Sequence, residues 1–138
     1  MTTQEWKQAE ESMKGLFARI KLEVDGYNVT IVKEFIRDKV NYIIYINGEL
    51  CGKWFNQDDK EFLEIRQRFY REVTCRAYSY RKKEEILSGV KSKKMRAEYI
   101  EKLGLDRTYS YCQMTFNSFK SVKAKLIKNN KSIKLIEL

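Results

Sequence analysis

The sequence predicts an α+β protein in which helices pack on one face of an antiparallel sheet. Apolar residues recur at helical spacing over residues 1–17, alternate with polar residues over 19–55, and return to helical spacing after residue 58. Two turn signals, Asp25-Gly26 and Asn47-Gly48, divide the alternating region into short strands. The predicted order is an N-terminal helix, a four-stranded antiparallel meander, three basic helices and a possible C-terminal edge strand.

The composition is typical of a folded protein of one domain. The chain has 138 residues, 43% hydrophobic content, and 9 Tyr, 7 Phe and 2 Trp, which is enough for a packed core. We expect a single domain over residues 1–138, with the helix and sheet in 1–56 and a basic helical half in 57–138. It has no apolar run of membrane-spanning length, no apolar stretch near the N-terminus and three widely spaced cysteines. These features predict a cytoplasmic protein with no membrane partner.

The first helix has a recognisable start. Thr2 and Glu5 have the spacing of a capping box, in which each side chain accepts a hydrogen bond from the other residue's backbone N–H. Behind this box the apolar residues at helical spacing are Trp6, Ala9, Met13, Leu16, Phe17 and Ile20. The pattern predicts a helix that ends at about Gly15 or Phe17.

The alternating region predicts a meander of four strands. Asp25-Gly26 joins strand 19–24 to strand 27–36, with Val24 opposite Tyr27, Leu22 opposite Val29 and Ile20 opposite Ile31. A polar turn at 37–39 leads to strand 40–46, and Asn47-Gly48 then leads to a fourth strand at 49–55. The expected pairs of this last hairpin are Tyr45 with Leu50, Ile43 with Gly52, and Asn41 with Trp54.

Helical spacing governs the C-terminal half. Asn56 or Asp58 is expected to cap a helix that Ser88-Gly89 ends, and its apolar stripe is Phe62, Ile65, Phe69, Val73 and Tyr80. A shorter helix is predicted at 91–103 with Gly104 as its stop, and a last helix after Asn117 or Ser118 with Phe119, Val122 and Leu126 facing inward. The pattern leaves residues 106–114 ambiguous, and residues 132–138 fit an extra edge strand.

The charge of the chain is unevenly distributed. Residues 1–65 carry 9 Lys/Arg and 12 Asp/Glu, whereas residues 66–138 carry 19 Lys/Arg and 7 Asp/Glu. The formal charges are therefore −3 and +12. A basic half in a small protein is the electrostatic signature of a polyanion-binding surface, most often for nucleic acid. The alternative is a charged helical surface that only faces water.

The candidate binding residues form three basic clusters. Arginine forks match phosphate geometry, and a tyrosine among them can stack on a base. The first cluster lies opposite the apolar stripe of the predicted helix and comprises Arg68, Arg71, Tyr78 and Lys82, continued by Arg81 and Lys83. The second comprises Lys91, Lys93, Lys94 and Arg96, and the third Lys120, Lys123, Lys125 and Lys128. The spacing leaves open whether the three clusters converge on one face.

Two tyrosine pairs add to this interpretation. Tyr109 and Tyr111 alternate along the chain, as do Tyr78 and Tyr80 upstream, and basic residues surround both pairs. Tyrosines interleaved with cations are typical of contacts to single-stranded nucleic acid or RNA. The alternative places two of the four tyrosines in the core.

Few catalytic chemistries remain open to this chain. It has no histidine, which excludes Ser-His-Asp and Cys-His nucleophiles and zinc sites that use histidine. Asp58, Asp59, Glu61 and Glu64 could together hold Mg²⁺ for a nuclease, but acidic residues in a first helical turn also complement the helix dipole. We therefore predict no catalytic residue, no metal, no cofactor and no enzymatic activity.

Two stretches of the sequence resemble a known group of proteins. They are the hairpin segments Asp25-Gly26-Tyr27 and Tyr45-Ile46-Asn47-Gly48, followed by Trp54-Phe55, and residues 118–133 near the end. Over about half its length the chain is similar to small accessory proteins of bacteriophages and prophages. That resemblance implies an anti-defence factor in the cytoplasm of a bacterial host, for example an anti-CRISPR protein that binds a Cas-type effector without chemistry.

The sequence as a whole predicts a non-enzymatic protein that binds nucleic acid or a nucleoprotein complex through its basic C-terminal half. The sharper form is an inhibitor of a host defence complex of the CRISPR-Cas type. Because the chain is basic, mimicry of DNA is disfavoured. Two alternatives stay open: a protein-only interaction module or homodimer that uses the sheet face, and a small metal-dependent nuclease. The oligomeric state is open as well.

Overall fold

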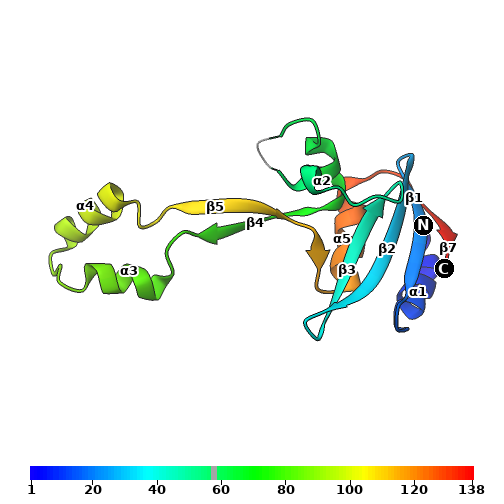
Figure 1. Cartoon of the computed structure of the whole chain (residues 1–138), viewed down its shortest axis with the longest axis horizontal. Coiled ribbons are helices and arrows are strands. Elements are labelled where there is room, and N and C mark those ends of the chain that lie inside the picture. Colours follow the sequence, from blue (N-terminus) through cyan, green and yellow to red (C-terminus); the bar gives the residue numbers. More distant parts are fainter. Residues whose placement is uncertain (57–58) are drawn as a thin grey trace. The chain divides into compact units, whose positions relative to one another are not determined.

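Figure 1 shows the computed structural model of the chain, which describes residues 1–56 and 59–138. The α+β class is confirmed. The elements in chain order are α1 (Thr3–Ser12), β1 (Arg19–Val24), β2 (Tyr27–Ile36), β3 (Lys39–Ile46), the 3₁₀-helix η1 (Gly52–Phe55), α2 (Leu63–Phe69), β4 (Arg71–Arg76), α3 (Tyr80–Leu87), α4 (Lys93–Leu103), β5 (Thr108–Gln113), β6 (Thr115–Phe116), α5 (Phe119–Asn129) and β7 (Ile133–Glu137).

The chain divides into two compact units. Unit 1 contains Met1–Glu72 and Cys112–Leu138, and unit 2 contains Val73–Tyr111. The boundary expected at residues 56 and 57 does not coincide with this division. Among the described residues, no helix combines the length and the apolar character that a membrane span needs.

Unit 1 contains an antiparallel sheet in the order β6-β3-β2-β1-β7. The β1–β2 register is the predicted one, with Val24 opposite Tyr27 and Ile20 opposite Ile31. Asp25 and Gly26 have φ angles of 47° and 88°, as a type I′ turn requires. Strand β7 pairs with β1, which confirms the C-terminal edge strand.

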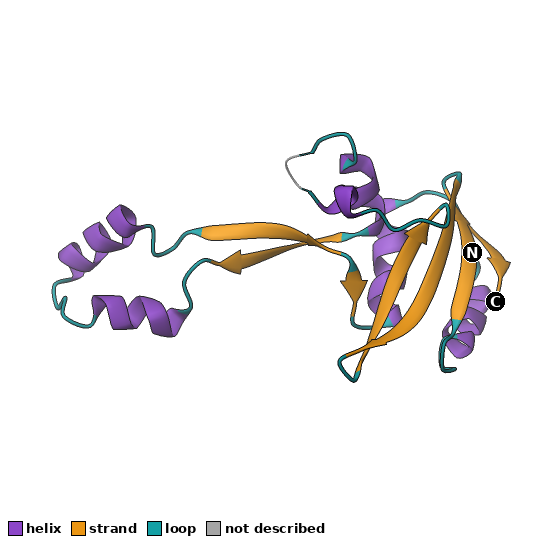
Figure 2. Ribbon diagram, viewed as in Figure 1, coloured by secondary structure: helices purple, strands orange, loops and turns teal. Residues whose placement is uncertain are grey.

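Helices α1, α2 and α5 supply side chains to a core on one face of this sheet, as the two layers in Figure 2 illustrate. The inward residues predicted for the last helix, Phe119, Val122 and Leu126, are all buried. The other core residues from the helices are Trp6, Ala9 and Met13 of α1 with its cap, and Phe69 of α2. The capping box is confirmed, because the Glu5 N–H donates to Thr2 Oγ1 and the Thr2 N–H donates to Glu5 Oε2.

The first helix is shorter than predicted. It ends at Ser12 with Met13 as its C-cap, and Leu16 and Phe17 beyond it are exposed. Phe17 has a φ of 57°, which is incompatible with a continuing right-handed helix. The apolar spacing therefore extends past the point at which the chain turns to enter β1.

The predicted fourth strand at 49–55 is wrong. Only an isolated bridge joins Ile46 to Glu49, and the expected pairs with Leu50, Gly52 and Trp54 do not form. The segment folds instead as η1, in which Trp54 is buried and its carbonyl accepts a hydrogen bond from Arg66 Nη1 at 2.9 Å. Strand β6 occupies the place beside β3 that the predicted strand would have taken.

The long helix predicted up to Ser88 is also wrong. Helix α2 ends at Phe69, and the buried Tyr70 is extended and donates its hydroxyl to the Ile44 carbonyl. The next residues form β4, where the β-branched pair Val73-Thr74 favours a strand. Phe62 precedes α2 without a side-chain cap, so Asn56 is not the N-cap, and Asp58 lies outside the described residues.

The remaining helices follow the sequence more closely. Helix α4 starts after the N-cap Ser92 and ends at Leu103, and the φ of 63° at Gly104 gives the predicted left-handed cap. However, α3 and α4 belong to unit 2, and the sheet core contains none of their described residues. Within unit 1, the helices of the C-terminal half that contribute to the sheet core are α2 and α5. The ambiguous stretch 106–114 contains β5.

Candidate nucleic-acid interface

Unit 2 is built on the two-stranded ribbon of β4 and β5, whose strands run in opposite directions in Figure 2. The Thr74 and Ser110 hydroxyls lie 2.9 Å apart, and the Ala77 N–H donates to the Arg107 carbonyl at 2.9 Å. Both contacts fit one antiparallel register, in which the residues opposite Val73 and Cys75 are Tyr111 and Tyr109. Because side chains alternate along a strand, these four residues share one face of the ribbon.

Polar contacts join helix α3 and the residues after it to α4. Arg96 donates to the carbonyls of Leu87 and Val90 at 3.1 and 3.0 Å and pairs with Glu84 at 2.8 Å. Lys83 pairs with Asp106. Arg96 and Lys83 were both predicted as binding residues, but these internal partners make them structural anchors of the unit.

The other cations of unit 2 face solvent. The unit contains ten Lys/Arg and five Asp/Glu, a formal charge of +5. Arg81 is 91% exposed in its side chain and makes a long 3.6 Å contact with Glu85. Seven further residues are exposed and have no ion pair within the described part of the chain: Arg76, Lys82, Lys91, Lys93, Lys94, Lys102 and Arg107.

The placement of these cations conflicts with the helix dipoles. Helices α3 and α4 have no acidic residue in their first turns, and Lys93 and Lys94 open α4 directly after Ser92. The N-terminal end of a helix carries partial positive charge and is stabilised by anions, so cations there are unfavourable in the free protein. A bound polyanion would relieve that repulsion.

Most of the tyrosines singled out by the sequence are exposed. Tyr109 and Tyr111 have side chains 54% and 42% exposed, and their rings lie near parallel, with centroids 6.5 Å apart and planes 27° apart. Tyr80 is exposed and Tyr78 half-buried. The alternative that two of these four tyrosines are core residues is wrong.

The first basic cluster does not form a single ridge, because the helix predicted to carry it does not exist. Arg68 and Arg71 belong to unit 1, and Tyr78, Arg81 and Lys82 belong to unit 2. Arg71 packs its guanidinium 5.6 Å from the centre of the Phe116 ring, and its buried Nε has no hydrogen-bond partner among the described residues. Arg71 is therefore packed against the core rather than presented to a ligand.

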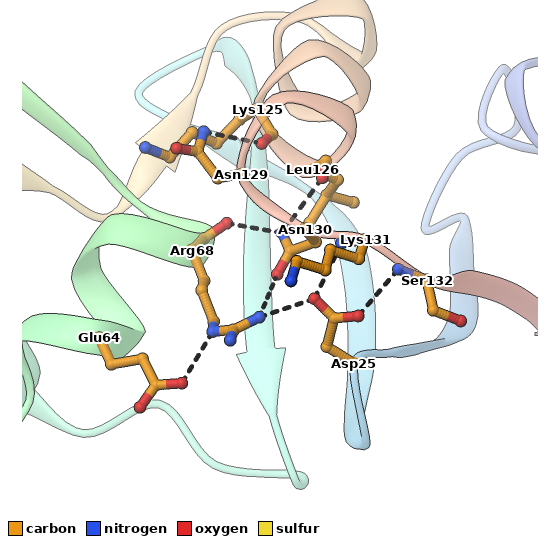
Figure 3. A network of polar contacts seen from close by, with 9 residues as sticks. All are labelled: Asp25, Glu64, Arg68, Lys125, Leu126, Asn129, Asn130, Lys131 and Ser132. Carbon is orange, nitrogen blue, oxygen red and sulfur yellow. Dashed lines mark hydrogen bonds and ion pairs between the residues drawn. The ribbon is translucent and has the colours of Figure 1, made fainter.

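Arg68 lies in a polar network that ties together three parts of unit 1 (Figure 3). Its guanidinium contacts Asp25 at 2.7 Å, Glu64 at 2.9 Å and the Asn130 side chain at 3.1 Å. The Asp25 carboxylate also accepts hydrogen bonds from the backbone N–H groups of residues 131 and 132. These contacts join the β1–β2 turn to α2 and to the start of β7. The positive charge of Arg68 is therefore paired with internal carboxylates.

The hydrogen bonds to Asp25 predict a pH dependence. The backbone N–H groups of Lys131 and Ser132, and then Arg68, lower the pKa of the Asp25 carboxyl. The stability that the ionised carboxylate contributes is present above the unfolded-state pKa of about 3.9 and is lost as the pH falls through the lower folded-state pKa. We expect Asp25→Asn to be less stable than the wild type at pH 7, with a difference that shrinks below about pH 4.

The measurement is thermal unfolding of both proteins from pH 7 to pH 3. Asp38→Asn is the matched control, because Asp38 also has a left-handed φ, of 63°, in a hairpin turn but is exposed. Asparagine tolerates that conformation, so backbone strain is unchanged in both variants. Equal loss of stability in the two variants at pH 7 would show that the network around Asp25 contributes nothing.

The third basic cluster divides in two. Lys120 and Lys128 are exposed on α5, whereas Lys123 lies 5.5 Å from the centre of the Trp6 ring and 3.7 Å from the Glu10 carboxylate. Lys125 is half-buried, and burial lowers its pKa. It lines a cavity of about 370 Å³ together with Leu63, Arg66, Gln67, Tyr70, Glu72 and Cys112.

Comparison of the chain with protein-family models, curated proteins and solved structures finds no match. The function must therefore be argued from the residues themselves. The exposed cations and tyrosines of unit 2 form the most coherent set of unsatisfied groups described above.

Of the four acidic residues that could hold Mg²⁺, Asp58, Asp59, Glu61 and Glu64, two carboxylates have other partners. The Asp59 carboxylate accepts the Glu61 N–H at 3.0 Å, and Glu64 pairs with Arg68. Asp58 lies outside the described residues. Within the described ranges, no group of three or more Asp, Glu, Cys or His is placed to hold a metal ion.

Three exposed cations of unit 2 were missed by the sequence-based selection: Arg76, Lys102 and Arg107. The apolar spacing predicts a helix at Arg76, whereas Arg76 ends strand β4. Arg107, Tyr109 and Tyr111 are every second residue, the spacing at which side chains share one face of a strand. Reading residues 106–114 as a strand would have placed Arg107 beside these tyrosines.

Proposed function

We propose that unit 2 binds nucleic acid, free or within a nucleoprotein complex, and that it does so without covalent chemistry. The observation that carries this proposal is the set of exposed cations of unit 2 that have no internal ion pair, defined above. Phosphates would neutralise these cations and release counterions from the nucleic acid. Arg76 and Arg107 suit bidentate phosphate contacts, and the lysines act as point charges.

The test is the salt dependence of binding. Fluorescence anisotropy of labelled 20-nucleotide RNA and DNA is measured with the full chain between 50 and 300 mM KCl. We expect log affinity to fall linearly with log salt, with a slope of about −0.7 per contacted phosphate on single strands and about −0.9 on duplex. Absence of binding at 50 mM, or a flat response to salt, would contradict the proposal and favour the protein-only module.

We extend the proposal to inhibition of a host defence complex of the CRISPR-Cas type, which rests on the resemblance to phage accessory proteins and on the basic charge of unit 2. Inhibition by binding is stoichiometric, so nuclease activity should stop falling once the complex is saturated. Competitor RNA should relieve it and a chelator should not affect binding. Loss of activity with a trace of the protein would instead favour the nuclease alternative.

One observation supports the alternative of a protein-only interaction module or homodimer: a hollow on the outer face of the sheet. On the sheet face opposite the core, Thr30, Val32 and Tyr45 are half-buried and line a hollow of about 290 Å³ with Arg19 and Gly48. A partner protein or a second copy of the chain would cover this face. Multi-angle light scattering of the free protein separates a homodimer from a monomer.

A further inference from the structure

The two stacked tyrosines of unit 2 are presented on one face of a strand. Tyr109 and Tyr111 alternate along β5, so both rings leave the same face of the ribbon. Opposite them in the register, on the same face, lie Cys75 and Val73, which are half-buried. The strand thus places the two rings next to each other on one face.

Among the described residues, the only ring contact of either tyrosine is with the other one. Within the described residues, neither tyrosine hydroxyl has a hydrogen bond, whereas those of Tyr45 and Tyr70 do. Large apolar rings contacting water are unfavourable, and each ring here has surface free for a further stacking partner. The pair forms a flat aromatic surface that is not part of a core.

Charge complementarity indicates what that partner is. Arg107 continues the alternation of Tyr109 and Tyr111 and therefore lies on their face of the ribbon, whereas Arg76 ends the neighbouring strand on the other face. Both arginines are exposed and unpaired within the described part of the chain. An aromatic surface with Arg107 on the same face and Arg76 at the edge of the ribbon matches a ligand with planar rings on a negatively charged backbone, which is the composition of a nucleic acid strand.

We propose that Tyr109 and Tyr111 form a stacking surface for unpaired nucleobases, so that unit 2 selects single-stranded over duplex nucleic acid. This inference rests on the proposed function and adds the class of ligand. In a duplex the base faces are already stacked on their neighbours, so only unpaired bases present a free face to the tyrosines. The cations then supply affinity for either form, and the tyrosines supply the preference for single strands.

The experiment separates bases from phosphates. Binding of the full chain is measured for three labelled probes: a 20-nucleotide oligoadenylate DNA strand, a strand of the same length made of abasic nucleotides, and a 20-base-pair duplex. The first two probes carry the same charge and differ only in their bases. We expect the wild type to bind the base-bearing strand at least tenfold more tightly than the abasic strand, because each stacked base contributes about fivefold or more and two rings are available.

Variants assign this preference to the two rings. Tyr109→Ala with Tyr111→Ala should reduce binding of the base-bearing strand to the level of the abasic strand and leave binding of the abasic strand unchanged. Tyr109→Phe with Tyr111→Phe keeps the rings and should retain the preference. Tyr99→Ala is the matched control, because Tyr99 is exposed on α4 of the same unit. Circular dichroism checks that each variant is folded.

The outcomes distinguish this inference from the proposed function. Equal, salt-dependent binding of the base-bearing and abasic strands by the wild type would overturn the stacking surface and leave phosphate binding intact. The wild-type comparison needs no variant, so a folding defect in the alanine variant does not obscure it. Absence of binding to all three probes at low salt would instead remove the proposed function itself.

Discussion

Replacing Phe69 with alanine is expected to destabilise unit 1 by about 3–5 kcal/mol. The Phe69 side chain is 0% exposed and meets the Tyr27 ring edge-on, with centroids 5.4 Å apart. Removal of a fully buried ring loses its transfer free energy and leaves a cavity that the neighbours fill only in part. Since a protein of this size is typically stable by about 5–15 kcal/mol, the variant would lose a large part of its stability.

The measurement is urea unfolding followed by tryptophan fluorescence. Trp6 and Trp54 both belong to unit 1, so their signal reports this unit and not unit 2. Leu63→Ala is the matched control, because Leu63 lies on the same helix but is 44% exposed, and its loss should cost about 1 kcal/mol or less. Similar midpoints for the two variants would mean that the packing of α2 on the sheet is not as described.

Reversing the charge of Lys91, Lys93 and Lys94 to glutamate should reduce nucleic-acid affinity by a hundredfold or more at low salt. These lysines are exposed at the start of α4 and before it, so the change removes phosphate contacts and adds like-charge repulsion. If all three contact phosphates, the salt slope on single strands should become less steep by about 2, at about 0.7 per contact. Stability should change little, because glutamates in the first turn agree with the helix dipole.

The control must match the change in net charge. Lys7, Lys39 and Lys53 are exposed in unit 1 without an ion pair among the described residues, and reversing all three gives the same overall charge. We expect this control to retain most of the affinity. If both triple variants bind equally weakly, net charge rather than unit 2 drives binding. A further variant, Lys120→Glu with Lys128→Glu, tests whether α5 takes part.

The features predicted correctly are hairpin turns and helix caps, which depend on residues close together in the sequence. A two-residue turn fixes the register of its two strands, which is why every predicted β1–β2 pair was confirmed. The capping box at Thr2, the cap at Ser118 and the left-handed Gly104 also depend on neighbours a few residues away. These features could be predicted without knowledge of the rest of the chain.

The errors occur where distant contacts override local patterns. Asn47-Gly48 has the strongest hairpin signal, yet Trp54 is drawn into the core beside Tyr70, with ring centroids 6.4 Å apart, and the strand does not form. Residues 71–76 fitted a helical stripe by spacing alone, but pairing with β5, more than thirty residues later, makes them a strand. Neither contact can be read from a local window.

The same reasoning explains which candidate site residues were misjudged. Arg68, Lys83 and Arg96 were selected because they are basic, but their partners Asp25, Asp106 and Glu84 lie 43, 23 and 12 positions away. Sequence shows charge, and only the fold shows whether that charge is neutralised. Arg81, Lys82, Lys91, Lys93 and Lys94 are exposed, and their role in binding stays a prediction.

The division into two units also bears on how the protein folds. Unit 2 is an insertion within unit 1, since the chain leaves at Glu72 and returns at Cys112, and these two residues face each other in the ribbon register. Folding of unit 1 must therefore close a long internal loop, and loop entropy grows as (3/2)RT ln n. Compared with a four-residue turn, the insertion adds about 2 kcal/mol to that entropic cost unless unit 2 orders first. The stability of unit 2 therefore affects how readily the sheet of unit 1 assembles, because an ordered insertion brings Glu72 and Cys112 together in advance.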